Sequence, residues 1–221
     1  MFGYMKSRLL ILLLLFFGTV ASVFAEAIGD RQSIDPLCFL AGLCLSGTER
    51  GYLAPSVCES FFREGGEQRA AELFLEVANT WDKTAASPTP MTHYFDPNGN
   101  RLVVKNQALA QAIRAFYAAP TNATDPNLAY IEPDREKRLS FLAGVYARRY
   151  LDGAFHGDSG SRAMRAAVLI LLAEGCEVYE LSYDYGVPET IHFKVKPSKQ
   201  VAQLFAFIDK WQPPHVEWKS K

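Results

Sequence analysis

The chain has 221 residues, 49% of them hydrophobic, and its 23 basic and 24 acidic residues give a net charge of −1. This balance argues against a protein that binds nucleic acid or an anionic membrane surface, because both functions need a basic excess. The length suits one domain, or two small domains packed together.

The first 25 residues have the pattern of a secretory signal peptide. Lys6 and Arg8 precede an unbroken apolar run over 9–17, and small residues lead to Ala25. The run is shorter than the roughly 20 apolar residues that a membrane span needs. We therefore expect cleavage after Ala25, with an uncleaved anchor as the alternative.

The mature chain, 26–221, is expected to be exported to the periplasm or secreted. Cleavage of 1–25 leaves 21 basic and 24 acidic residues, a net charge of −3, and no membrane span is predicted after cleavage. The mature chain is predicted to form a single α+β domain.

Apolar residues predict two short helices over 36–46 and 55–63. A long amphipathic helix is predicted after Gly65-Gly66, and it should end before the proline-rich connector 85–90. These three helices would form an N-terminal helical subregion within 26–84.

The remaining elements alternate between helices and two β-hairpins. The first hairpin is predicted over about 91–105, around a turn made of Asp, Pro, Asn and Gly. The predicted helices cover 107–117, 133–151, 163–173 and 198–211. The helix over 163–173 is apolar on every face, which predicts that it is the buried centre of the fold.

The second hairpin, over 178–196, is predicted from strict alternation of apolar and polar residues. A turn centred on Val187 would place Leu181 opposite Phe193 and Glu180 opposite Lys194. This register turns the tyrosines of the first strand toward the core. The complete prediction is a mainly helical α+β fold with about six to seven helices around a buried central helix.

Four cysteines in a chain addressed to an oxidising compartment predict two disulfides. If 36–46 and 55–63 form an antiparallel helical pair, Cys44 lies opposite Cys58. Cys38 is then left to pair with Cys176. That bridge would tie the N-terminal subregion to the C-terminal half.

The segment His-Gly-Asp-Ser-Gly-Ser-Arg at 156–162 contains the tetrapeptide that surrounds the nucleophile of trypsin-like serine proteases. One hypothesis makes Ser159 a nucleophile, with His156 as its base and Asp158 nearby. The segment reads as a loop between two helices, whereas a nucleophile elbow needs a strand before the serine. We therefore favour a structural turn and predict no catalytic residue.

A third interpretation of the same region is an anion site. Ser161, Arg162 and Arg165 lie at the start of the 163–173 helix, where free N–H groups and basic side chains suit a carboxylate or phosphate. The competing structural interpretation is a helix cap.

Neither a metal nor a cofactor is expected. The four histidines are not spaced as metal ligands, and no glycine-rich phosphate loop is present. The sequence favours a non-enzymatic binding protein whose partner is another protein or a component of the cell envelope. The alternatives are a hydrolase using Ser159 with His156, and a small-anion binder at the helix start 158–165.

Overall fold

The computed structural model describes residues 34–44, 54–63, 67–84, 90–118, 134–158, 161–184 and 190–220. Residues 35–221 form one compact unit. The predicted signal peptide and residues 85–89 of the connector lie outside the described residues. The predicted α+β class is confirmed: the described residues form six helices and two sheets. None of these helices has the length and apolar character of a membrane span.

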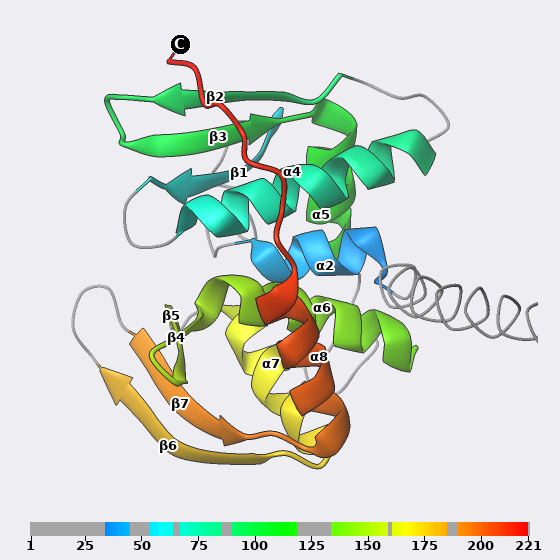
Figure 1. Ribbon diagram of the computed structural model, residues 1–221, viewed down its shortest axis with the longest axis vertical. Helices are drawn as coiled ribbons and strands as arrows, with labels where there is room; N and C mark the ends of the chain where they lie inside the picture. Colours follow the sequence, from blue (N-terminus) through cyan, green and yellow to red (C-terminus); the bar gives the residue numbers. More distant parts are fainter. Residues whose placement is uncertain are drawn as a thin grey trace, which may run out of the picture. The chain divides into compact units, whose positions relative to one another are not determined.

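One half of the fold is a three-stranded antiparallel sheet with two helices (Figure 1). The strand order is β1-β3-β2. The strands are β1 (Val57–Phe62), β2 (Thr92–Asp96) and β3 (Arg101–Lys105), and the helices are α4 (Glu67–Thr84) and α5 (Gln107–Ala118).

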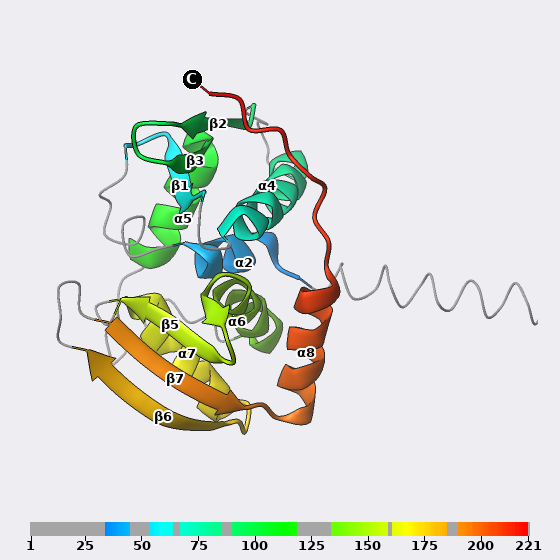
Figure 2. The same cartoon turned by 60° about the vertical axis from the view of Figure 1, so that its left-hand side comes forward.

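The other half is a four-stranded antiparallel sheet with three helices, and α7 covers one face of the sheet (Figure 2). The strand order is β4-β5-β7-β6. The strands are β4 (Tyr150–Leu151), β5 (Ala154–Asp158), β6 (Glu177–Asp184) and β7 (Thr190–Lys196), and the helices are α6 (Arg135–Arg149), α7 (Arg162–Ala173) and α8 (Lys199–Lys210).

The buried centre is α2 (Pro36–Leu43), which packs against α4, α5 and α6. Asp35 caps this helix by accepting a hydrogen bond from the backbone N–H of Cys38, and every residue from Cys38 to Leu43 is buried. The prediction that 163–173 is the central buried helix was wrong. α7 buries one face, while Leu172 on its other side is 52% exposed.

Residues 57–62 form β1, so the helix predicted over 55–63 was wrong. β1 pairs with β3, and it buries Val57, Cys58 and Phe61. The partners in this pairing are 39 positions apart for Phe62 and Arg101 and 48 positions apart for Val57 and Lys105. A short segment that gains its hydrogen bonds from so distant a strand carries little local signal.

The 178–196 hairpin has the predicted register only near its turn. Pairs such as Ser182 with His192 centre on residue 187, but a bulge between Tyr179 and Ser182 shifts the register beyond it. Within the bulge, Glu180 has a φ of 51°, and its carboxylate lies 2.6 Å from the Lys194 ammonium.

The prediction that the tyrosines of β6 face the core was wrong. Tyr179, Leu181 and Tyr183 are 41%, 48% and 48% exposed. Phe193 on β7 is buried. The bulge and the position of β6 at the edge of the sheet leave these side chains on the surface.

All four cysteines are buried free thiols, so the structure contains neither predicted disulfide. The thiol of Cys44 donates to the carbonyl of Leu40, and that of Cys58 donates to the carbonyl of Asn106. The predicted pairing of Cys44 with Cys58 required two antiparallel helices, whereas residues 57–62 form a strand.

The residues after α8 run along α4 and end beside β2 (Figure 1). The Trp211 indole donates to Glu76, and the His215 ring lies 3.1 Å from a carboxylate oxygen of Glu72. The backbone N–H of Phe95 then donates to the carbonyl of Lys219. This C-terminal tail joins the two halves of the fold.

Candidate functional site

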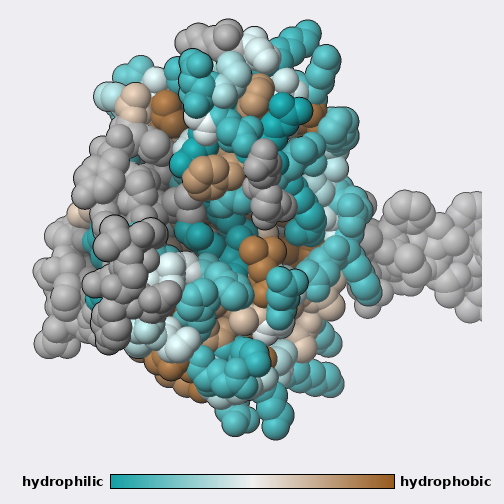
Figure 3. All heavy atoms as spheres, turned by 90° about the vertical axis from the view of Figure 1, so that its left-hand side faces the viewer, coloured by the Kyte–Doolittle hydropathy of each residue, from teal (hydrophilic) through white to brown (hydrophobic). Residues whose placement is uncertain are grey.

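A cavity of about 500 Å³ lies between the two sheets. Figure 3 shows this side of the molecule, where the surface is hollowed and hydrophilic residues lie inside the hollow. The described lining residues come from both halves of the fold: Phe62, Glu67, Asn100, Arg148, Arg149, Leu151 and His156.

Arg148, near the end of α6, lines this pocket and forms hydrogen bonds to several other elements. Its guanidinium donates to both carboxylate oxygens of Glu67, at 3.0 and 3.2 Å, and to the backbone carbonyls of Leu43 and Ser60. The side chain is fully buried. Arg148 therefore joins α6, α2, β1 and α4.

A second buried carboxylate lies close to Arg148. Glu59 of β1 is 1% exposed, and one of its carboxylate oxygens lies 3.7 Å from an Arg148 nitrogen. The Arg148 guanidinium also stacks over the Phe61 ring, 4.2 Å from its centre. Two carboxylates thus surround this one cation.

The pKa of Glu67 reflects the same arrangement. Burial alone would raise this pKa, but the charge and hydrogen bonds of Arg148 and a hydrogen bond from the Phe62 amide lower it below its usual value. Glu67 therefore remains ionised at neutral pH.

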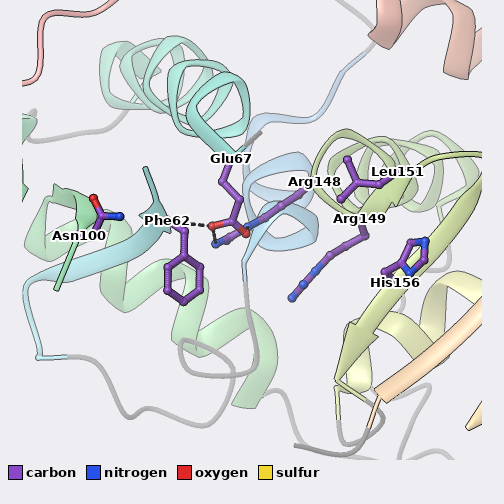
Figure 4. Close-up of a pocket in the computed structure, with 7 residues that line it drawn as sticks. All are labelled: Phe62, Glu67, Asn100, Arg148, Arg149, Leu151 and His156. Carbon is purple, nitrogen blue, oxygen red and sulfur yellow. Dashed lines mark hydrogen bonds and ion pairs between the residues drawn. The ribbon is translucent and has the colours of Figure 1, made fainter. Parts of the chain in front are cut away.

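Arg149 is placed differently from its neighbour. Figure 4 shows its side chain extending away from the Arg148–Glu67 pair into the open part of the pocket. Among the described residues, no carboxylate or carbonyl accepts a hydrogen bond from Arg149. Burial and the adjacent charge of Arg148 lower its pKa to about 10, so its guanidinium is still charged at neutral pH.

His156 of β5 lines the pocket, and its ring contacts a second histidine, His192. The Nδ1 atoms of His156 and His192 lie 2.6 Å apart, and the Nε2 atom of His192 lies 3.0 Å from the Thr190 hydroxyl. Because the His192 contact occupies Nδ1 of His156, Nε2 is the nitrogen left to contact a ligand.

The rim of the pocket is partly apolar. Phe62 is 45% exposed and Leu151 is 49% exposed, both large fractions for apolar side chains. The Arg101 guanidinium stacks 3.4 Å from the centre of the Phe62 ring. The pocket thus combines a charged interior with apolar walls, which is common in ligand sites.

Of the residues proposed for catalysis, the structure brings His156 into the pocket and places Asp158 two residues further along β5. Ser159 lies outside the described residues. A helix was predicted before Ser159, which spoke against a nucleophile elbow. This prediction was wrong, because the strand β5 ends at Asp158. The elbow pattern still lacks its final glycine, since Ser161 stands there.

The residues proposed for an anion site lie at the start of α7. Ser161 is buried, and its hydroxyl accepts a hydrogen bond from the Met164 amide at 3.4 Å, as a helix cap does. Arg162 lies with its guanidinium 6.0 Å from the centre of the Tyr117 ring, and Arg165 is exposed. None of the three is among the described residues that line the pocket.

Sequence reasoning missed the two arginines that dominate the site. The only local signal was a pair of basic residues, Arg148 and Arg149, at the end of a predicted helix, which is also a common way to complement the helix dipole. Their different environments depend on Glu59 and Glu67, which are distant in sequence.

Comparison with protein families, with curated proteins and with solved structures finds no match to this chain.

Proposed function

We propose that the protein binds a small anionic ligand in this pocket, with the guanidinium of Arg149 as the main contact. The observation that carries the proposal is the position of Arg149, which is charged, extends into the cavity and has no acceptor among the described residues. A guanidinium offers a planar fork of donors that matches a carboxylate or phosphate.

The neighbouring Arg148 differs from Arg149 because it has carboxylate partners within the protein. Arg148 is matched by Glu67 and Glu59, so its charge is balanced within the protein. Arg149 is half-buried, and the charges of Glu67, Glu59 and Asp158 act on it only through space. A bound anion would supply the direct partner that it lacks among the described residues. In the tautomer that carries its hydrogen on Nε2, His156 would donate a second hydrogen bond to the anion.

The exposed rim residues indicate the rest of the ligand. Phe62 and Leu151 offer apolar surface at the mouth of the pocket. We therefore expect an amphipathic ligand, with an acidic group at Arg149 and an apolar group against Phe62. Phenylphosphate and benzoate are simple probes of this chemistry.

Thermal denaturation with these probes tests the proposal. A ligand that binds only the folded state raises the melting temperature. At a ligand concentration of one hundred times Kd, it adds about 2.7 kcal/mol to the free energy of unfolding. We expect stabilisation of the wild type, partial retention in Arg149→Lys and loss in Arg149→Met. Arg165→Met is the control and should bind as the wild type does. Equal stabilisation of Arg149→Met and the wild type would refute the proposal.

The pattern of residues 1–25 supports export, so we propose that the protein acts outside the cytoplasm as a non-enzymatic binding protein. The ligand would then be an acidic component of the cell envelope or an acidic group of a partner protein. N-terminal mass spectrometry of exported material tests this part, with Glu26 as the expected first residue. Retention of 9–17 would indicate an anchor.

A second candidate function is hydrolysis by Ser159 with His156. It is favoured by one observation: a strand precedes Ser159, and His156 on that strand lines the pocket. A fluorophosphonate probe separates the two functions. Labelling that disappears in Ser159→Ala supports hydrolysis, and the absence of labelling supports a binding protein.

A further inference from the structure

His156 and His192 are neighbours across two paired strands. They are direct partners in the β5–β7 ladder. Their neighbours Phe155, Ile191 and Phe193 are buried, and since side chains alternate between the two faces of a sheet, the two imidazoles share the opposite face. This pair could not be predicted from the sequence, because the two histidines are 36 positions apart.

The two rings approach each other through the same kind of atom. Their Nδ1 atoms lie 2.6 Å apart, and their planes are inclined by 78°. A contact this short between two ring nitrogens is a hydrogen bond, so one Nδ1 atom carries the hydrogen and the other presents its lone pair.

Thr190 determines which nitrogen of His192 is free. Its hydroxyl oxygen lies 3.0 Å from Nε2 of His192. When this oxygen accepts the Nε2 hydrogen, Nδ1 of His192 is left as a bare lone pair directed at His156. Metal-binding histidines have such a partner on their second nitrogen, which fixes the tautomer and the ring orientation.

We propose that His156 and His192 bind one late first-row divalent ion, of the class Cu²⁺, Ni²⁺ or Zn²⁺, through their Nδ1 atoms. Imidazole nitrogen suits these ions. With metal–nitrogen bonds of about 2.0–2.1 Å, two ligand nitrogens lie roughly 3.0–3.4 Å apart. From the observed 2.6 Å the rings must therefore separate by about 0.4–0.8 Å and turn so that both lone pairs point at the ion.

Binding requires one proton to move and none to be lost. The hydrogen shared between the Nδ1 atoms shifts to Nε2 of His156, and both Nδ1 lone pairs then face the ion. Within the described part of the chain, no group of three or more His, Cys, Asp or Glu side chains is placed to hold a metal. Water therefore completes the coordination, which leaves the ion exchangeable.

Isothermal titration of the reduced protein with Ni²⁺, in chloride buffer at pH 7.5, tests the proposal. We expect one ion per chain, an affinity at least tenfold lower in His156→Ala and in His192→Ala, and tighter binding of Cu²⁺ than of Ni²⁺. Thr190→Val keeps both ligands but removes the hydrogen bond that orients His192, so the affinity should fall by about ten- to hundredfold.

The remaining histidines provide matched controls. His93→Ala and His215→Ala should bind Ni²⁺ as the wild type does. His192→Asn, which is closer in size, replaces His192→Ala if circular dichroism shows that the alanine variant is unfolded. A wild type that binds no Ni²⁺, or a His192→Asn variant that binds it equally, would overturn the proposal.

The titration contains no carboxylate or phosphate, so its result does not depend on the anion pocket. Failure to bind Ni²⁺ would refute the histidine site and leave the Arg149 proposal standing. If Arg149→Met left anion binding unchanged, the Arg149 proposal would be refuted and the histidine site would stand.

Discussion

Gly42 of α2 and Gly144 of α6 face each other where the two helices cross. A Cβ atom on Gly42 would lie 2.1 Å from the carbonyl oxygen of Phe141, and one on Gly144 would lie 2.1 Å from that of Phe39. The two backbones are thus in direct contact, and neither position has room for a side chain.

We predict that Gly42→Ala and Gly144→Ala each lower the free energy of unfolding by about 3 kcal/mol, because the helices must separate to admit a methyl group. Urea denaturation measures the effect. Gly99→Ala is the control, since a Cβ there would meet only side-chain atoms, of Arg101 at 3.2 Å and of Asp96 at 3.5 Å. A Gly144→Ala variant as stable as the wild type would show that the helices do not cross this closely.

The two adjacent arginines should respond to substitution in opposite ways. Arg148→Met leaves Glu59 and Glu67 without their cation, so we expect a loss of about 3–5 kcal/mol. Arg149→Met removes a half-buried charge that has no hydrogen-bond acceptor among the described residues, so we expect unchanged stability or a gain of about 1 kcal/mol. Urea denaturation of both variants decides the matter, and equal losses would contradict the assignment of distinct roles.

How far the sequence predicted the fold depended on how local each signal was. The amphipathic period after Gly65-Gly66 predicts a surface helix, and α4 covers 67–84. β1 and β5 were missed, because β1 pairs with the distant β3, and β5 pairs over most of its length with the distant β7 and only at its start with the adjacent β4. β5 contains Gly157, which reads as part of a turn but leaves room for the Met164 side chain.

The candidate site was harder to predict than the fold for the same reason. Arg148 and Arg149 are adjacent and chemically identical. Only the positions of Glu59 and Glu67 make one of them a structural residue and leave the other facing the cavity. His156 was singled out for a serine that follows it, whereas its observed partner is His192.

The buried thiols should react slowly in the folded protein. Burial raises the pKa of Cys58 to about 12 and raises that of Cys44 well above its ordinary value, with the nearby Glu59 charge adding to the latter shift. At pH 8 the thiolate fraction of Cys58 would fall by roughly a thousandfold relative to a free cysteine. Iodoacetamide labelling of reduced protein, followed by peptide mapping, should show protection in buffer and full reaction in urea.

The same shift predicts a loss of stability in alkali. A thiol with a raised pKa in the folded state stabilises the fold fully below its unfolded pKa, and this contribution is lost as the pH rises toward the folded pKa. For Cys58 that window runs from about pH 9 to about pH 12. We expect Cys58→Ala to flatten the pH dependence of the melting temperature over the accessible part of this window, and an unchanged slope would contradict the shift.

The second hairpin offers a test of which strand is buried. Phe193 is buried, so Phe193→Asp should prevent folding, whereas Leu181→Asp should cost no more than about 1 kcal/mol because Leu181 is 48% exposed. Circular dichroism and urea denaturation compare the two variants. Unfolding by Leu181→Asp would restore the register expected from the sequence alone.

The C-terminal tail constrains when the fold can be completed. Residues 212–220 lie along α4 and add a backbone contact at Phe95, yet they are the last of the described residues to be synthesised. A nascent chain can form β1, α4, β2 and β3 long before the segment that crosses them has left the ribosome. The contact of the tail with β2 can therefore form only after β2 itself has been made, and until it forms, the β2 edge remains open to pairing with another chain.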